Sequence, residues 1–258
     1  MDRSTILFDK MLTFTSSAFF ELESSVLLDQ VCSSARHVLD VGCGNGDYLS
    51  RYINHFPQSR AIGLDLNASI IQQAKDKHGD EIAFYNCSYE NLPASDPFDT
   101  ILARLVIDHI PDRTPFWNWL QQRAAMNGSV IIIDIDGYGI SDCAKLPLFT
   151  SMYKELRDRI RRPSFLPFHD ALRLEMETFG LKHVSTTKYQ LVIHSKELQV
   201  QFYHYLRSVT ELMTIQPSHE SAPCQHNRSA IYEELENWLD EENNTMEIGM
   251  FCLHAKRI

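Results

Sequence analysis

The sequence has no excess of positive charge and no compositional bias, and both absences narrow the class of protein. Its 24 Lys and Arg residues are outnumbered by 34 Asp and Glu residues, which gives a formal net charge of −10 at pH 7. Surfaces that follow the phosphates of DNA or RNA are normally basic, so a nucleic acid is not the expected partner. Ten Gly, ten Pro and 44% hydrophobic residues among 258 exclude collagen-like and disordered chains.

Long apolar runs and paired cysteine motifs are also missing. A membrane-spanning helix needs about 20 apolar residues, whereas the longest run here is the strand-sized 130–133. Residues 1–5 carry an acid at position 2 and precede no long apolar run, so we expect no signal peptide. The six cysteines form no CxxC pair and no metal-like spacing, and reduced thiols in a cytoplasmic protein are the simplest interpretation. Neither a metal nor a membrane is therefore expected as a partner, and the oligomeric state is not indicated.

Residues 36–136 alternate between short apolar runs and helix-compatible segments. The apolar runs, expected to be strands, are 37–41, 61–64, 82–85, 100–103 and 130–133. The helical segments between them are 47–55, 68–78 and 115–126. This order predicts βαβ units and a parallel sheet with both faces covered.

The rest of the chain is predicted to be mostly helical. Helices are expected over much of 1–30, at 171–179, around 198–212 and at 231–239. Extended segments are expected at 182–193 and near 248–255. The aromatic residues of the first and fourth of these helices, Phe14, Phe19, Phe20, Phe202, Tyr203 and Tyr205, are expected to pack in the core, and some of them to line a lid.

The strongest motif is a glycine-rich loop between a strand and a helix, VLDVGCGNGDYL at residues 38–49. Gly42, Gly44 and Gly46 permit a sharp turn and the close approach of a ligand, which a Cβ would block. Asp65 ends the next strand, 21 residues after Gly44, where a carboxylate can accept hydrogen bonds from both hydroxyls of a ribose. The pair of features predicts a nucleoside-containing cofactor.

The spacing of the glycines distinguishes between cofactors. Dinucleotide-binding loops run GxGxxG, and the third glycine would fall on Asp47. The loop is instead DxGxGxG over 40–46, which resembles motif I of the class I S-adenosylmethionine (SAM) dependent methyltransferases. The resemblance covers about residues 36–136. It continues in NLP at 91–93 (third motif), 98–112 (fourth strand and turn) and 127–134 (fifth-strand hairpin).

The resemblance implies an α/β fold with a Rossmann-like, doubly wound, seven-stranded sheet. The implied strand order is 3-2-1-4-5-7-6, with the last strand antiparallel. Residues 1–258 would form one methyltransferase domain, whose core is 36–136 with 170–194 and 246–258. The helical cap insertions would be 1–30, 137–168 and 195–244, and we expect residues 1–25 and 227–242 to fold over the crevice. A cap excludes water and suits a small-molecule acceptor better than a polymer.

The resemblance also implies the cofactor, S-adenosyl-L-methionine, and the residues that hold it. Asp40 would order the glycine loop, and Gly42 and Gly44 would lie against the methionine part. Asp65 would hold the ribose hydroxyls, with Leu66 against the adenine.

Two further cofactor-binding positions depart from simple transfer of the family pattern. Ser88 stands where the family usually has an acid near the adenine amine; its hydroxyl can still accept a hydrogen bond, and the backbone N–H of Tyr89 can serve the ring. Arg104 falls where the chain leaves the fourth strand beside the sulfonium. A cofactor or substrate contact and a surface ion pair are both compatible with Arg104.

His109 is the candidate general base. Methyl transfer to oxygen or nitrogen depends chiefly on positioning, and a base helps when the acceptor carries a proton. Imidazole titrates in the useful pH range. The alternative is a histidine that caps or packs against the loop after the fourth strand.

Two charged groups receive a structural interpretation. Asp134 and Asp136 are expected to end the fifth strand as a solvated turn, the alternative being orientation of a cationic acceptor. Metal-dependent, catechol-type relatives have an acid where this chain has Arg104, which argues against a metal. The four arginines of 157–162 are expected on a solvated face; contact with an anionic substrate or an acyl-carrier partner is the alternative.

The sequence therefore predicts methyl transfer from SAM to an oxygen or nitrogen of a small molecule, for example a specialised metabolite. A catalytically silent SAM-binding protein would carry the same motifs. A nicotinamide-dependent oxidoreductase would share the strand, glycine loop and acid, but not Asp47. Fold and cofactor motifs do not specify the acceptor or distinguish O-, N- and C-methylation.

Overall fold

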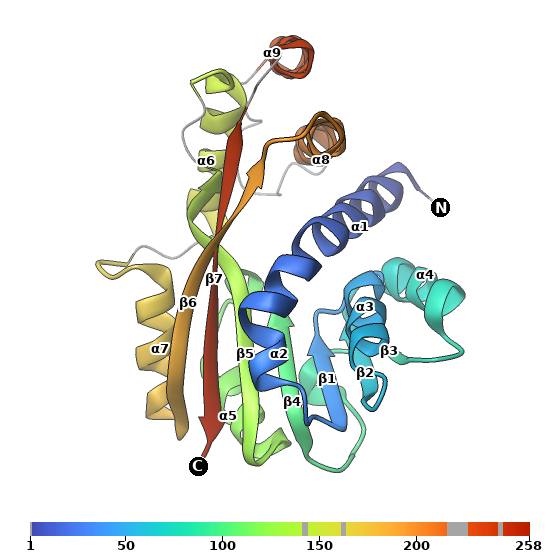
Figure 1. The fold of residues 1–258 in the computed structure, drawn as a ribbon, viewed down its shortest axis with the longest axis vertical. Helices are drawn as coiled ribbons and strands as arrows, with labels where there is room; N and C mark the ends of the chain where they lie inside the picture. Colours follow the sequence, from blue (N-terminus) through green and yellow to red (C-terminus); the bar gives the residue numbers. More distant parts are fainter. Residues whose placement is uncertain (1, 141–143, 161–163, 216–226, 242–244) are drawn as a thin grey trace.

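A seven-stranded mixed sheet forms the centre of the molecule (Figure 1). The structure, a computed structural model, describes residues 2–140, 144–160, 164–215, 227–241 and 245–258. The strands are β1 (His37–Val41), β2 (Arg60–Asp65), β3 (Ala83–Asn86), β4 (Phe98–Arg104), β5 (Ala124–Ile140), β6 (Leu181–Ile193) and β7 (Met246–Arg257). Their order is β3-β2-β1-β4-β5-β7-β6, and β7 is antiparallel to both of its neighbours. The predicted sheet, its order and its reversed last strand are confirmed.

Helices cover the two faces and one end of this sheet. They are α1 (Arg3–Glu23), α2 (Asp29–Val31), α3 (Asp47–His55), α4 (Ala68–His78), α5 (Thr114–Arg123), α6 (Pro147–Ile160), α7 (Phe168–Thr178), α8 (Lys196–Ile215) and α9 (Arg228–Asp240). The π-helical turn η1 (Ser24–Leu28) joins α1 to α2, and η2 (Tyr89–Asn91) and η3 (Ile107–His109) are short 3₁₀ turns. The bounds of α3 and α4 are those predicted, while α5 ends at Arg123 because Ala124 already begins β5.

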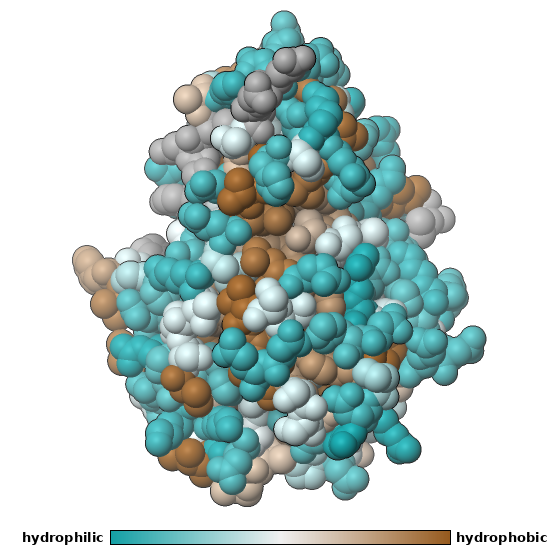
Figure 2. Space-filling model, in the orientation of Figure 1, coloured by the Kyte–Doolittle hydropathy of each residue, from teal (hydrophilic) through white to brown (hydrophobic). Residues whose placement is uncertain are grey.

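Burial on both faces explains the continuous apolar run in β5. Ile131 and Ile133 pack in the core that includes residues of α1 and α3, whereas Val130 and Ile132 pack against α5 and α7. A strand covered on both faces has no polar side to alternate with. Figure 2 shows a band of hydrophobic surface across the middle of one face of the molecule, with mostly hydrophilic surface above and below it.

The helices α6, α8 and α9 lie beyond one end of the sheet, and α1 lies beside α8 (Figure 1). Phe14 of α1 packs on Phe202 and Tyr205 of α8, with ring centroids 5.7 and 5.1 Å apart. This confirms core packing for these aromatic residues. The strand β5 continues to Ile140, beyond the predicted start of the cap at 137, because its last residue still pairs with Ile248 of β7.

Two features concern the described residues only. None of their helices is both long and apolar enough to cross a membrane. Cys32, Cys43, Cys87 and Cys252 are free thiols, and the other two cysteines lie outside the described ranges.

Candidate active site

A cavity of about 1010 Å³ lies where β1, β2 and β4 end. Residues from α1, α6, α8 and the loops after these strands complete its wall. All nine residues predicted for the site line it: Asp40, Gly42, Gly44, Asp65, Leu66, Ser88, Tyr89, Arg104 and His109. The structure thus brings these residues together, and their roles stay predictions.

The glycine loop is a left-handed turn held against β2. Gly42, Gly44 and Gly46 have φ of +75°, +55° and +78°, a region that residues with a Cβ rarely adopt. The N–H groups of Gly42 and Cys43 donate to the carbonyl of Leu64 at 2.8 and 3.0 Å. A Cβ on Gly44 would lie 2.8 Å from Cδ1 of Leu12 in α1. Glycine is therefore required both for the turn and for the packing of α1 on it.

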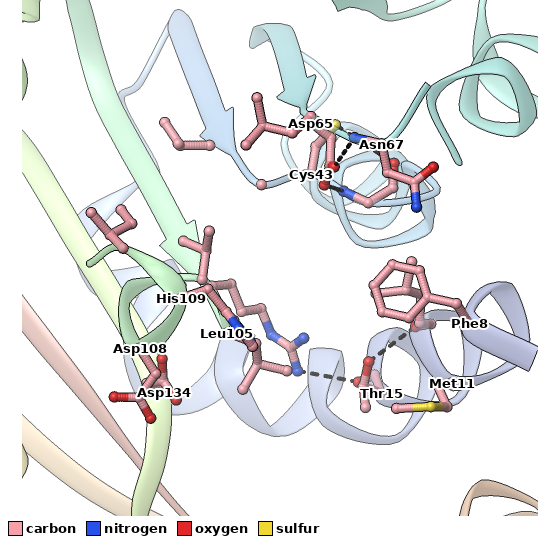
Figure 3. Close-up of a pocket in the computed structure, with 18 of the residues that line it drawn as sticks. Phe8, Met11, Thr15, Cys43, Asp65, Asn67, Leu105, Asp108, His109 and Asp134 are labelled. Carbon is pink, nitrogen blue, oxygen red and sulfur yellow. Dashed lines mark hydrogen bonds between the residues drawn. The ribbon is translucent and has the colours of Figure 1, made fainter. Parts of the chain in front are cut away.

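Asp65 connects this loop to the second strand. Its Oδ2 accepts from the N–H of Gly44 at 3.1 Å and its Oδ1 accepts from the N–H of Asn67 at 2.8 Å. Each carboxylate oxygen keeps a further acceptor site, which suits a pair of ligand hydroxyls. In the close-up of Figure 3, Asp65, Asn67 and Cys43 lie on one side of the cavity and Phe8 of α1 lies across from them.

The neighbouring residues form an open apolar rim. Leu66 is 74% exposed, an unusual position for a leucine unless a ligand covers it. Ser88 immediately precedes the turn η2, and the ring of Tyr89 packs edge-on against Phe116 and Trp119 at 5.0 and 5.3 Å. This packing fixes the chain that would face the cofactor base.

Asp40 is the most unusual group in the wall. It is 2% exposed, and its Oδ1 has no hydrogen-bond partner among the described residues. Burial raises its pKa to about 7, the positive charge of Arg104 lowers it and the negative charge of Asp65 raises it further. A buried carboxyl oxygen without a partner is costly, so it marks a place where a ligand donor or cation fits.

Arg104 forms a buried ion pair with the N-terminal helix. Its Nε donates to Oε2 of Glu23 at 2.9 Å, and one terminal nitrogen donates to Oε1 of Glu23 and to the carbonyl of Thr15, both at 3.2 Å. The Tyr189 hydroxyl also donates to Glu23, and the guanidinium lies 4.6 Å from the centre of the Tyr48 ring. The expectation of a surface ion pair is wrong, because the side chains of Arg104 and Glu23 are 8% and 1% exposed. Glu23 was not foreseen, since nothing in its local sequence indicates a partner 81 residues away.

His109 lies on the cavity wall in the turn η3, beside Leu105 and near Asp108 (Figure 3). Its ring is exposed in the cavity, yet the protein around it lowers its pKa, and the positive charge of Arg157 lowers it further against the opposing effect of Asp108. Neutral imidazole is the form that accepts a proton, so His109 fits the role of a base.

A buried acid–base cluster that sequence reasoning missed lies behind His109. Arg157 of α6 donates to Asp108 and approaches Oδ1 of Asp134 at 3.7 Å. The expected solvated face is therefore wrong at Arg157, which is buried, whereas Arg159 is exposed and pairs with Glu155. The helix turns only one side to solvent, so neighbouring arginines separate. Residues 161–162 lie outside the described ranges.

The two acids of the fifth strand also separate. The prediction that Asp134 and Asp136 end the strand as a solvated turn is wrong, because β5 continues to Ile140. Asp134 is 1% exposed and lines the cavity. Asp136 does not line it and instead pairs with Lys188 at 3.1 Å. Among the described residues, no group of three His, Cys, Asp or Glu is placed to hold a metal ion.

The predicted covering of the crevice is correct for the first helix and wrong for the last. Ser4 to Ser16 of α1 contribute to the cavity wall, but no residue of α9 does. Instead, Glu234 of α9 accepts the N–H groups of Leu148 and Phe149 at the start of α6. The helix α9 thus supports α6, and position 242 lies outside the described residues.

Comparison with known proteins identifies the fold and the family. A family model described as a methyltransferase domain matches residues 33–213, well over half of the chain. A tRNA U34 carboxymethyltransferase of Alteromonas mediterranea is 26% identical over 59% of this chain and 47% of its own length. A trans-aconitate 2-methyltransferase of Afipia carboxidovorans is 24% identical, with 54% and 57% covered. The chain thus aligns with about half the length of these curated relatives.

Among solved structures, the chain is similar to a geranyl diphosphate C-methyltransferase from Streptomyces coelicolor A3(2). That structure contains Mg²⁺, geranyl diphosphate and S-adenosyl-L-homocysteine. The TM-score is 0.54 at 14% identity, with 92% of this chain and 79% of that chain covered. At this identity the likeness shows the fold alone.

Proposed function

The chain belongs to the class I SAM-dependent methyltransferases, and from this premise we propose that it is an enzyme that methylates an oxygen or nitrogen of a small-molecule acceptor. The family's cofactor is S-adenosyl-L-methionine. A nicotinamide cofactor has no support from the family match. The cofactor motifs leave the acceptor open, since the relatives are named for a tRNA and for a small acid.

The observation that supports the proposal most is the convergence of Asp40, Asp65 and the glycine loop on one cavity. The Oδ1 of Asp40 has no partner among the described residues, which fits the positive charge of the cofactor's methionine part. Asp65 keeps an acceptor site on each oxygen for the ribose hydroxyls. The exposed Leu66 offers an apolar surface to the adenine. The residues present therefore fit SAM.

The proposed roles follow from these positions. Bound SAM supplies a methyl group on a sulfonium, a leaving group that needs no activation by the protein. The protein's contribution is to orient the acceptor, exclude water and remove a proton where the acceptor has one. His109 is the residue proposed to take that proton, because its lowered pKa keeps it neutral near pH 7.

A small acceptor is proposed because helices cover the cavity. Residues of α1, α6 and α8 line it, and we propose that these segments act as a cap over the cofactor core. The net charge of −10 does not favour a phosphate backbone as acceptor. The volume lies near the upper end of the roughly 300 to 1000 Å³ typical of ligand pockets, which leaves room beside a cofactor.

The test is methyl transfer itself. The purified chain is incubated with methyl-labelled SAM and a panel of alcohols, phenols, amines and acids, and label in product and formation of S-adenosylhomocysteine are followed. We expect transfer to at least one O or N acceptor, and no transfer by Asp65→Ala. A chain that binds S-adenosylhomocysteine but methylates none of them would support the catalytically silent alternative.

A further inference from the structure

We infer that the acceptor is a mainly apolar molecule that carries one hydroxyl or amine and no phosphate or carboxylate, held between α1, α6 and α8. This inference rests on the proposed function and adds the chemical class of the acceptor. It is carried by the side chains of the far wall of the cavity and by the pairing of its cations.

The wall opposite the glycine loop is apolar over two helices. Its residues are Leu156 and Ile160 of α6 and Tyr205, Val209, Leu212 and Met213 of α8. Spacings of three and four residues place each set on one face of its helix. From α1, Phe8, Met11 and Leu12 add to the same cavity. Three helices thus turn apolar side chains to one space, which is suited to bury an apolar molecule.

The described cations of the wall are already paired. Arg104 is bound to Glu23 and Arg157 to Asp108, and all four side chains are at most 8% exposed. Breaking a buried pair to bind an anion would leave a carboxylate buried and uncompensated, which is costly. The remaining basic group is His109, whose lowered pKa leaves it uncharged near pH 7.

Acidic groups increase the barrier to an anion. Asp40, Asp65, Glu90 and Asp112 also line the cavity, and the last two are exposed to solvent. A phosphate or carboxylate entering the space would meet these charges without an unpaired cation among the described lining residues. A neutral or amine-bearing molecule meets no such repulsion. Its single polar atom would lie toward His109 while its body contacts α6 and α8.

The experiment compares matched pairs of probes that differ in one charged group. The pairs are 2-naphthol with 2-naphthyl phosphate, and decylamine with decanoic acid. Binding to the full chain saturated with S-adenosylhomocysteine is measured by calorimetry, which does not depend on turnover. We expect the uncharged or amine member to bind at least tenfold tighter in each pair. Equal or tighter binding of the anionic member, or no binding of either member at millimolar concentration, would overturn the inference.

A cation placed in the apolar wall tests the location. Leu212→Lys is expected to reduce the preference for the neutral member at least tenfold, because it supplies the missing positive charge. The matched control is Val200→Lys, on the same helix but exposed and outside the cavity, which should leave the preference unchanged. Circular dichroism and unchanged S-adenosylhomocysteine affinity show that each variant is folded; a folded Leu212→Lys with the wild-type preference would contradict the location. Val209→Lys serves as a second variant if Leu212→Lys does not fold.

The two levels of the proposal fail separately. If the wild-type chain does not bind S-adenosylhomocysteine, the proposed function fails. If it binds S-adenosylhomocysteine and favours the anionic probes, only the acceptor class fails.

Discussion

The affinity of the chain for S-adenosylhomocysteine should depend on pH through Asp40. Burial holds the pKa of this carboxyl at about 7 in the ligand-free protein, above the ordinary value of 3.8. Asp40 is therefore mostly neutral at pH 6 and mostly ionised above pH 7. A ligand ammonium next to its Oδ1 favours the ionised form, so a proton must leave when the ligand binds at low pH. Affinity should rise with pH up to about 7 and then level off.

The size of the effect follows from the same pKa. For one group titrating near 7 whose pKa falls well below 6 on binding, the dissociation constant at pH 6 should be roughly fivefold to tenfold that at pH 7.5. Staying at or below pH 7.5 limits loss of the proton from the ligand's own amino group, since α-amino groups in peptides titrate near 8. The difference corresponds to about 1 kcal/mol.

Isothermal titration calorimetry at the two pH values gives the dissociation constants. Buffers of different ionisation enthalpy give the number of protons released. Asp40→Asn should bind more weakly than wild type at pH 7.5 and lose the pH dependence, whereas the control His109→Gln should keep it. Equal dissociation constants at pH 6 and 7.5 in wild type, or the same dependence in folded Asp40→Asn, would refute the reasoning.

Three further predictions test the loop, the base and the cap. Gly44→Ala should abolish measurable S-adenosylhomocysteine binding in calorimetry, because its Cβ would meet Leu12, whereas Gly137→Ala, with a similar φ of +57° and nothing within 4 Å of its Cβ, should bind normally; normal binding by both would reduce the loop to a turn. His109→Gln should lower kcat with little change in S-adenosylhomocysteine affinity and remove the fall in rate at acid pH, below the ordinary histidine value of 6.5, that protonation of this base causes; an unchanged pH–rate profile would exclude it as the base. Hydrogen exchange should slow on ligand binding in the glycine loop and in α1, and protection confined to 40–105 would contradict the cap.

The sheet and the cofactor half of the cavity were predictable because their signals are local. Each parallel strand is a short apolar run that ends in a turn, so the chain order indicates which ends meet at one edge. Asp40, the glycines and Asp65 follow two adjacent strands, and their proximity requires nothing more than the pairing of β1 with β2. The antiparallel position of the last strand came from family resemblance and not from periodicity.

The acceptor half was not predictable, since its contacts join segments far apart in the chain. The charge of Arg157 indicates a solvated helix face until the fold places Asp108 next to it, 49 residues earlier in the chain. Glu23 pairs with Arg104 only because α1 crosses the end of β4. Likewise α9 carries an apolar face that suited a lid, yet it packs behind α6. Amphipathic spacing shows that a face is covered but not what covers it.

The central claim is that this cavity binds SAM with Asp65 on the ribose, and calorimetry with S-adenosylhomocysteine tests it most directly. We predict that the wild-type chain binds S-adenosylhomocysteine and not NADH. Asp65→Ala should weaken binding by about 1.5 to 3 kcal/mol, because two ligand hydrogen bonds are lost. Asp76→Ala, an exposed acid of α4 outside the cavity, should bind like wild type. An unchanged dissociation constant in folded Asp65→Ala, or a wild-type chain that binds NADH in place of S-adenosylhomocysteine, would contradict the account.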